Sequence, residues 1–160
     1  MSKATRTKVG KLLVGGVAAA AVAVPLALLS APAQAATTLG GCTVDPLAPV
    51  RVGTSPAGVP LVRFSTRVTC VQDRIIQIQD QRFEADAPAG VAGDDGYGAS
   101  TYLRTFAAPS TILLSTTDEV TNTEAGNEEA YHRTSFRVAS IGGVSGWTPF
   151  EDSPVLSVAI

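Results

Sequence analysis

The chain has 160 residues, 45% of them hydrophobic, and a formal net charge of −2 at pH 7. Four of its twelve basic residues lie within the first 35 positions, whereas all fourteen acidic residues follow them. The later part therefore carries eight arginines, no lysine and a formal net charge of −6. Its length suits a single domain, and its negative charge argues against nucleic acid as a partner.

Residues 1–35 have the three regions of a Sec-type signal peptide. Four basic residues precede an uncharged run from Leu12 to Leu29, and Ala33-Gln34-Ala35 then places small residues where signal peptidase reads them. We expect cleavage before Ala36, a mature domain of residues 36–160, and no stable membrane span afterwards. The expected location is extracellular or cell-wall associated, and the lysine-free composition, rich in Ala, Gly and Val, is typical of a GC-rich bacterial genome.

Two alternatives to simple secretion come from the same region. The uncharged run of eighteen residues is near the lower limit for a membrane-spanning helix, so a retained anchor is the first. Leu39-Gly40-Gly41-Cys42 resembles a bacterial lipoprotein box, so lipidation of Cys42 is the second. In lipoproteins the box directly follows the apolar run, whereas Cys42 lies thirteen residues beyond Leu29. We favour cleavage before Ala36, which an intact-mass measurement would distinguish from both alternatives.

The chain has two cysteines, Cys42 and Cys70. In an oxidising compartment two cysteines are expected to pair. The loop that this disulfide closes would account for about 3.6 kcal/mol of stability in the chain-entropy model. We therefore predict one disulfide that ties the segment around Cys42 to the core.

Period-two alternation is the main structural signal after the signal peptide. From Val62 to Cys70, apolar residues and threonine alternate with polar ones over nine positions, which is typical of a half-buried strand. Ile75 to Phe83 is predicted as a second strand. Its glutamines share one face with Ile75 and Phe83, while Ile76 and Ile78 lie on the other face. The alternation therefore allows either face to be the buried one, and a bulge is plausible.

The rest of the chain continues as short strands between turns. Ala87–Ser100 is predicted to be irregular, residues 102–106 and 112–116 to form a hairpin, and Asp118–Glu129 to be a solvated loop. Further strands are expected at residues 131–138, 147–150 and 155–160. Seven to eight short strands without an amphipathic helix predict an all-β fold, an antiparallel β-sandwich with one disulfide.

The segment Tyr131-His-Arg-Thr-Ser-Phe-Arg-Val-Ala-Ser-Ile-Gly-Gly-Val-Ser-Gly-Trp-Thr-Pro-Phe150 resembles the penultimate strand and following hairpin of a fibronectin type III domain, an immunoglobulin-like sandwich. Ser145-Gly146-Trp147-Thr148 is similar to the second half of the Trp-Ser-x-Trp-Ser box of cytokine receptors, where arginines of the preceding strand stack on tryptophan. The resemblance implies a cation–π stack of Arg133, Arg137 and Trp147. Two features depart from the family: no tryptophan stands in the strand around Leu61–Val71, and a Cys42–Cys70 bridge is not a family feature.

Catalytic patterns are weak in this sequence. His132 is the single histidine and so the one candidate base of the usual kind, and its alternation with Thr134 and Phe136 places it inward as a structural residue. The carboxylates come in pairs adjacent in sequence, whose side chains point to opposite faces of an extended chain. We therefore expect no enzyme activity and no cofactor.

Two binding hypotheses concern the Gly- and Asp-rich stretch before residue 100. Asp86, Asp94 and Asp95 flank a loop with oxygen ligands of the kind that calcium prefers, although no recognised calcium-loop spacing is present, so a metal site is not assigned. Tyr97 and Tyr102 lie in or beside the same stretch, and tyrosine among Gly, Ser and Asp is common in binding loops. Asp94, Asp95, Tyr97 and Tyr102 are therefore the predicted binding residues.

These features predict a secreted, non-catalytic binding or interaction module whose partner is an extracellular protein or glycan. One alternative is a secreted inhibitor of a protease or glycosidase, in which an exposed loop such as Ala87–Ser100 enters the enzyme. A small secreted hydrolase is the third hypothesis.

Overall fold

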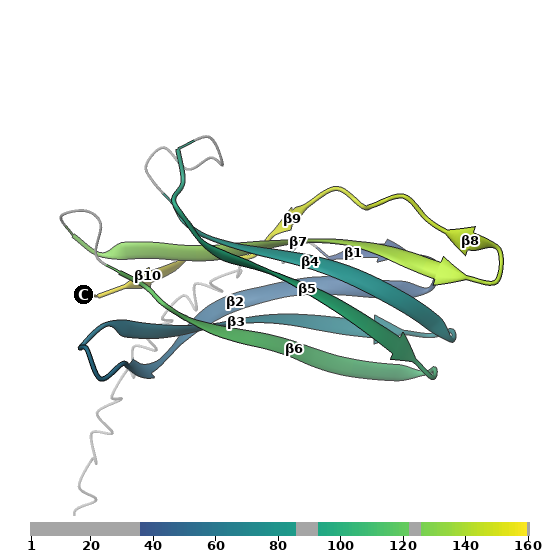
Figure 1. The fold of residues 1–160 in the computed structure, drawn as a ribbon, viewed down its shortest axis with the longest axis horizontal. Helices are drawn as coiled ribbons and strands as arrows, with labels where there is room; N and C mark the ends of the chain where they lie inside the picture. Colours follow the sequence, from purple (N-terminus) through teal and green to yellow (C-terminus); the bar gives the residue numbers. More distant parts are fainter. Residues whose placement is uncertain (1–35, 86–92, 122–125, 160) are drawn as a thin grey trace, which may run out of the picture. The chain divides into compact units, whose positions relative to one another are not determined.

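The computed structural model describes residues 36–85, 93–121 and 126–159. The predicted signal peptide, Asp86 and part of the predicted Ala87–Ser100 loop lie outside these residues. The described residues belong to one compact unit, Ala31–Ile160. In it, two antiparallel sheets face each other as a β-sandwich, which confirms the predicted fold class (Figure 1).

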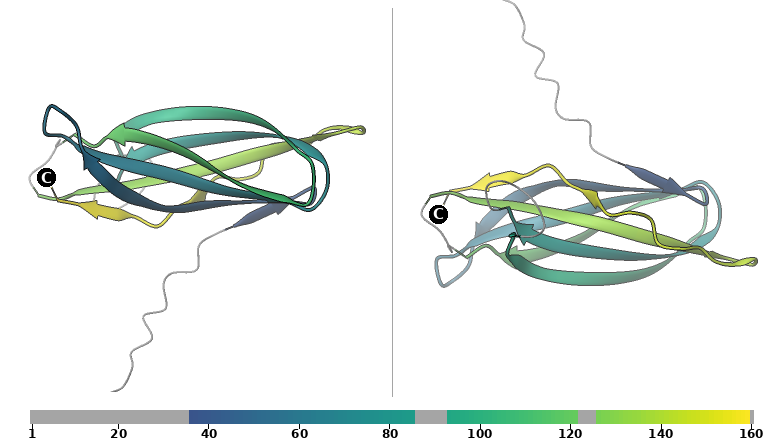
Figure 2. Two further views of the ribbon diagram at one scale, coloured as in Figure 1. Left: turned by 90° about the horizontal axis from the view of Figure 1, so that it is seen from below. Right: turned by 90° about the horizontal axis from the view of Figure 1, so that it is seen from above.

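The first sheet has the order β1-β2-β3-β6, and the second has the order β10-β7-β4-β5, with β8 and β9 also paired to β7 (Figure 2). The first sheet consists of β1 (Thr37–Leu39), β2 (Cys42–Thr54), β3 (Pro60–Cys70) and β6 (Ser110–Glu119). The second consists of β4 (Arg74–Glu84), β5 (Gly96–Phe106), β7 (Glu128–Ser140), β8 (Gly143–Val144), β9 (Glu151–Asp152) and β10 (Leu156–Val158). The described residues contain no helix long and apolar enough to cross a membrane.

Alternation predicted the buried faces of β3 and β7 correctly. Inward residues of β3, from Val62 to Cys70, are buried at every second position, and His132 on β7 is buried with its alternation partners. On β4 the isoleucine face turns inward, so Ile76 and Ile78 enter the core and the glutamines point outward. The pairing of β4 with β5 shifts register between Arg82 and Phe83, opposite the start of β5.

Four predicted elements were wrong. The segment Asp118–Glu129 is not a solvated loop in its described residues, because its ends belong to β6 and β7 and both Val120 and Glu128 are buried. Residues 102–106 and 112–116 do not form a hairpin, because β5 pairs with β4 and β6 pairs with β3 in the other sheet. The turn between them carries the chain from one sheet to the other. Residues 96–100, predicted to be irregular, begin β5. Residues 145–150 lie outside any strand, although Thr148 N donates to the carbonyl of Phe136 on β7.

Strand β2 was not predicted. Pro46 and Pro49 interrupt its alternation, and its pairing with β3 shifts register between Leu47 and Val50 and again between Arg51 and Gly53. Proline lacks a donor for the ladder, so it occurs in strands at edges or irregular points. Cys42 nevertheless pairs directly with Cys70 in this ladder, and the predicted disulfide joins them.

A polar layer crosses the interior and separates two apolar clusters. One cluster surrounds the disulfide and includes Ile76, Ile78 and Phe136. The second, smaller cluster contains Val62, Phe64, Val120, Ala130 and Val158. Between them lie buried polar side chains from three strands, namely Thr66 of β3, Asp80 and Arg82 of β4, and His132 and Thr134 of β7.

Candidate functional site

The predicted binding residues are involved in contacts within the domain. Tyr97 packs against the smaller apolar cluster, and Tyr102 packs against the larger one. The Tyr102 hydroxyl lies 2.5 Å from Thr116 Oγ1 on β6, so it joins the two sheets. Neither tyrosine stands on a free loop, because both belong to β5 and are half-buried.

The two aspartates of this stretch also have structural contacts. The Tyr131 hydroxyl donates to Asp94 Oδ2 at 2.5 Å, and the carbonyl of Asp95 accepts from Glu84 N at 2.8 Å. Burial, followed by this hydrogen bond to Asp94, raises the pKa of Tyr131 above its ordinary value. Within the described part of the chain no three His, Cys, Asp or Glu side chains gather as a metal site.

His132 is fully buried and has oxygen neighbours at both ring nitrogens. Its Nδ1 lies 3.3 Å from Asp80 Oδ1, and its Nε2 lies 2.9 Å from the carbonyl oxygen of Leu47. Phe64 packs against its ring edge with a centroid separation of 5.7 Å. In this position the imidazole ties β7 to β4 and to β2, and it has no open side from which to act on a substrate.

Arginines and aromatic rings stack along the outer face of β7. The Arg137 guanidinium lies 4.8 Å from the Trp147 ring centroid, as the resemblance implied, and its Nε donates to Gln77 Oε1 at 2.8 Å. Arg133 does not share this ring. It lies 4.7 Å from the Phe150 ring centroid, because the segment after β8 runs along β7 and brings a second aromatic residue beside it. Arg133 and Arg137 are four residues apart, about 13 Å in a strand, which is too far for one ring to cover both.

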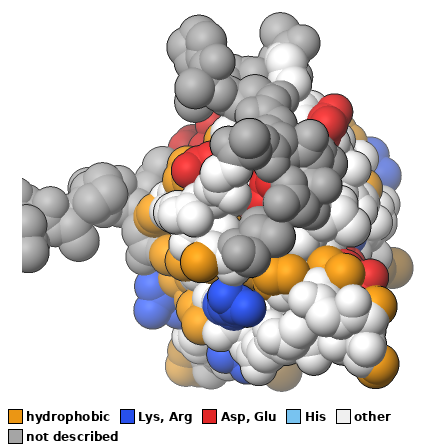
Figure 3. Space-filling model, turned by 90° about the vertical axis from the view of Figure 1, so that its left-hand side faces the viewer, with side chains coloured by type: hydrophobic (Ala, Val, Ile, Leu, Met, Phe, Trp, Pro, Cys, Tyr) orange, Lys and Arg blue, Asp and Glu red, His pale blue; other side chains and the backbone are white. Residues whose placement is uncertain are grey.

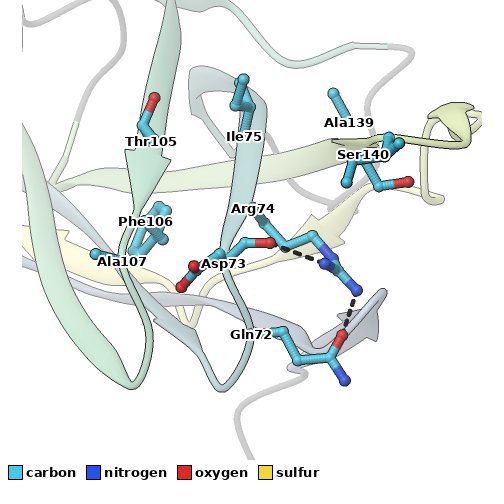
Figure 4. Close-up of a pocket in the computed structure, with 10 residues that line it drawn as sticks. Gln72, Asp73, Arg74, Ile75, Thr105, Phe106, Ala107, Ala139 and Ser140 are labelled. Atoms are coloured by element: carbon cyan, nitrogen blue, oxygen red, sulfur yellow. Dashed lines mark hydrogen bonds between the residues drawn. The ribbon is translucent and has the colours of Figure 1, made fainter.

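A hollow of about 690 Å³ opens where three turns meet at one end of the sandwich (Figure 4). It is lined from three directions. Asp73 and Arg74 lie where the β3–β4 turn enters β4, Phe106 and Ala107 where β5 ends, and Ser140 and Ile141 where β7 passes into the β7–β8 turn. The Arg74 guanidinium is held by the carbonyls of Gly40 and Asp73 and by the Gln72 side chain. Arg74 therefore joins the β1–β2 turn to the β3–β4 turn beside the hollow.

Exposed aliphatic side chains lie around the hollow at this end of the sandwich. We call the hollow and these side chains the turn-end surface; they are Val71, Ile75, Leu103, Ile141 and Val144. Val71 is 66% exposed in the β3–β4 turn, and Ile75 is 45% exposed beside the hollow. Ile75 also lines a smaller hollow of about 140 Å³ with Leu103 and Val144, so the apolar surface continues onto the outer face of the second sheet. Ile141 is fully exposed on the β7–β8 turn, which projects beyond the other strands in Figures 1 and 2.

The opposite end of the sandwich also carries side chains of several kinds. Figure 3 shows hydrophobic, arginine and acidic side chains side by side there. Large contiguous apolar patches on a protein surface commonly mark interaction sites. The turn-end surface is therefore the strongest candidate recognition site among the described residues.

Sequence reasoning did not find this surface. Its aliphatic residues are scattered over 71–144 in the chain, and only the pairing of β4 with β5 and β7 brings them together. One signal was present: Ile75 stands on the glutamine face of its strand, opposite the isoleucines that fill the core. An aliphatic residue out of phase with the buried face indicates a surface position.

Comparison of the chain with family models found no match, and comparison with curated proteins found none either.

Proposed function

We propose that this chain is a secreted, non-catalytic binding module of the fibronectin type III or immunoglobulin-like kind, which recognises an extracellular protein or glycan through the turn-end surface. Export is supported by the signal-like N-terminus and by a disulfide, which is characteristic of oxidising compartments. The observation that carries the proposal is the hollow of about 690 Å³ flanked by exposed Ile75 and Ile141.

The strand order supports the immunoglobulin-like assignment. Lettered in the manner of that fold, β2, β3 and β6 take the places of strands A, B and E in one sheet. Strands β10, β7, β4 and β5 take the places of G, F, C and C′ in the other. Two departures stand beside this correspondence. The disulfide lies within one sheet, and the tyrosine at the start of β7, Tyr131, bonds to the side chain of Asp94 instead of to backbone.

The position of the surface on the scaffold also supports the proposal. Loops and turns at the ends of a sandwich carry recognition residues because a rigid framework holds them while their sequence varies. Ligand pockets combine an apolar lining with a few placed polar groups, and here Asp73, Arg74 and Ser140 are the polar groups beside an aliphatic rim. The rim is aliphatic, which favours a protein over a glycan as partner.

A matched pair of variants tests this proposal. Ile141→Asp places a charge on the fully exposed tip, and Val155→Asp places one at a 51% exposed position next to β10, away from the hollow. Both should leave the melting temperature unchanged. A partner isolated from culture supernatant or cell wall should then bind the wild type and Val155→Asp with equal Kd in calorimetry, and Ile141→Asp at least tenfold more weakly. Equal binding by all three proteins would refute the turn-end surface, and a glycan array separates the two partner classes.

A secreted enzyme inhibitor is the second candidate, and one observation favours it. An aliphatic side chain at the tip of a projecting hairpin, as Ile141 is, has the shape needed to enter an enzyme cleft. The loop concerned is then the β7–β8 turn. The predicted Ala87–Ser100 loop lies partly outside the described residues and partly in β5.

Enzyme assays separate this candidate from the first. Equimolar protein mixed with a panel of secreted proteases and glycosidases should abolish the activity of one of them if the inhibitor hypothesis holds. Ile141→Asp should then restore the activity, while Val155→Asp should still inhibit. Full activity of every enzyme in the panel, together with a partner that binds in the previous experiment, would leave the binding module as the function.

A further inference from the structure

Among the described residues, strand β6 forms an uncovered edge of the first sheet. It pairs with β3 through ten consecutive residues without a register shift, and the strand order places no other strand on its far side. The other edge strand of that sheet, β1, and the edge strand β10 of the second sheet have three residues each. A long edge strand offers backbone donors and acceptors to any further strand.

Two backbone hydrogen bonds establish which residues of β6 direct their backbone N–H and C=O groups away from β3, toward the open edge. Val120 N donates to the carbonyl of Pro60 at 2.9 Å, so these residues form a hydrogen-bonded pair just beyond the ladder. Val71 N donates to Gly41 O on the β2 side of β3, which requires the neighbouring Cys70 to bond toward β6. Because hydrogen-bonded and non-bonded pairs alternate in an antiparallel ladder, the even-numbered residues of β6 bond to β3. The open edge therefore presents the N–H and C=O groups of Thr111, Leu113, Ser115, Thr117 and Glu119.

The comparable edge of the second sheet, β5, is protected. Ala85 N donates to Glu129 O, so the odd-numbered residues of β4 bond to β7 and the even-numbered ones bond to β5. The backbone groups of Thr101 and Leu103, which lie between the bonded residues of β5, therefore point away from β4. The Arg104 guanidinium caps the outward carbonyl of Leu103 at 2.9 Å, and a register shift distorts the start of the strand. Bulges and charged residues of this kind prevent pairing at natural edges.

Strand β6 lacks such protection. It contains no proline, lysine or glycine, and its charged residues are confined to Asp118 and Glu119 at one end. Among the described residues, no side chain bonds to the outward backbone groups of β6. Leu113 is 58% exposed in the middle of the strand. The features that normally discourage strand addition are therefore absent from this edge.

We propose that β6 pairs antiparallel with β6 of a second copy of this chain, about a two-fold axis at Ser115. The five outward residues are spaced symmetrically about Ser115, so this register pairs Thr111 with the partner's Glu119 and Leu113 with the partner's Thr117. Each pair exchanges two main-chain hydrogen bonds, and every outward donor and acceptor is satisfied. The two four-stranded sheets become one continuous sheet of eight strands, in the way that strand addition extends other sheets.

The charges of β6 select the antiparallel orientation. A parallel arrangement would place the acidic ends of both strands side by side, and like charges directly opposite one another are destabilising. In the antiparallel arrangement each Glu119 faces a threonine of the partner. The two Glu119 residues then lie at opposite ends of the interface, about 27 Å apart for an eight-residue separation. The surface therefore fits a second copy of the chain running in the reverse direction.

Cysteine cross-linking and proline substitution test this proposal with the full chain, expressed in an exporting host and then purified. Both native cysteines are in the intramolecular disulfide, so a new cysteine is the only free thiol of the described residues. Ser115→Cys should form a disulfide-linked dimer under oxidation, because residues opposite each other in a ladder lie within disulfide reach. Thr101→Cys on the protected β5 edge is the control and should form no disulfide-linked dimer, although it keeps the β6 edge.

Thr117→Pro removes an outward donor that β3 does not use, so the fold should be retained. In sedimentation velocity the wild type should approach twice the monomer mass as its concentration rises to about 100 μM, whereas Thr117→Pro should stay monomeric with unchanged circular dichroism. A wild type that is monomeric throughout, or cross-linking that is equal at residues 101 and 115, would overturn the proposal. So would a different protein whose binding Thr117→Pro abolishes while the wild type stays monomeric.

Discussion

Nδ1 of His132 and Oδ1 of Asp80 lie 3.3 Å apart in the interior of the sandwich, where these two residues are 0% and 2% exposed. The same carboxylate oxygen lies 3.9 Å from Arg82 Nη1. Arg82 in turn donates to Asp118 on β6 and to Ser100 on β5. One buried network therefore links both sheets through their polar side chains.

Removing the carboxylate from this network should be costly. Asp80→Ala leaves Arg82 and His132 buried without one of their partners, and breaking a buried pair in this way costs about 3 kcal/mol or more. The control is Asp152→Ala, which breaks the ion pair between Arg133 and the Asp152 carboxylate, a side chain that is 56% exposed. That change should cost less than about 1 kcal/mol. Denaturant unfolding followed by circular dichroism measures both, and similar losses would contradict a structural role for the buried network.

A methyl group at Gly98 should disturb the same network from β5. A Cβ built at this position would lie 3.0 Å from Arg82 Nη2, and the guanidinium cannot move without losing Asp118 or Ser100. We expect Gly98→Ala to lower the free energy of unfolding by about 1–2 kcal/mol. Gly126→Ala is the matched control, because Gly126 also has a positive φ, 137° against 158° at Gly98, but its Cβ would meet no atom within 4 Å. A Gly98→Ala protein as stable as this control would show that Arg82 has room to shift.

The disulfide should contribute a large part of the stability. A Cys42→Ala/Cys70→Ala double variant loses the cross-link that closes a 28-residue separation, which corresponds to about 3.6 kcal/mol in the chain-entropy model. Guanidinium unfolding under oxidising conditions should show the loss, and a reductant should then lower the wild-type midpoint while leaving the variant unchanged. Identical midpoints for the two oxidised proteins would mean that the ladder between β2 and β3 is sufficient without the bond.

Alkaline conditions should weaken the fold through Tyr131. Burial and the Asp94 hydrogen bond raise the pKa of its phenol, so the folded state keeps the proton at a pH where the unfolded chain loses it. Stability is then independent of this group below about pH 10 and falls as the pH rises above that value. Tyr131→Phe should remove this part of the fall, while losing about 1 kcal/mol at neutral pH with the hydrogen bond. Parallel pH profiles for wild type and variant would contradict the assignment.

Local patterns in the sequence predicted what depends on local order. Alternation from Val62 to Cys70 identified β3 and its buried face, and the two cysteines identified the disulfide. The arginine stack on Trp147 followed from a short motif, although its second arginine required Phe150, which the motif does not contain.

Features that depend on tertiary pairing were not predictable in this way. Strands β5 and β6 are separated by a short turn, as hairpin strands are, and only their partners β4 and β3 assign them to different sheets. Tyr97 and Tyr102 lie in or beside a segment with the composition of a binding loop. They pack against the apolar clusters instead, because their strand, β5, pairs with β4. The turn-end surface combines residues from three turns, so no contiguous pattern records it.

The polar layer also has a consequence for amide exchange. Because it separates the two apolar clusters, each half of the domain can open with a free energy of its own, as cooperative units within other proteins do. The cluster around Cys42 and Cys70 is larger and cross-linked, whereas the cluster around Val62 and Val158 relies on five buried side chains. Backbone amides near Val158 should therefore exchange with solvent earlier than those near Cys70, and a protease should find its first access at that end.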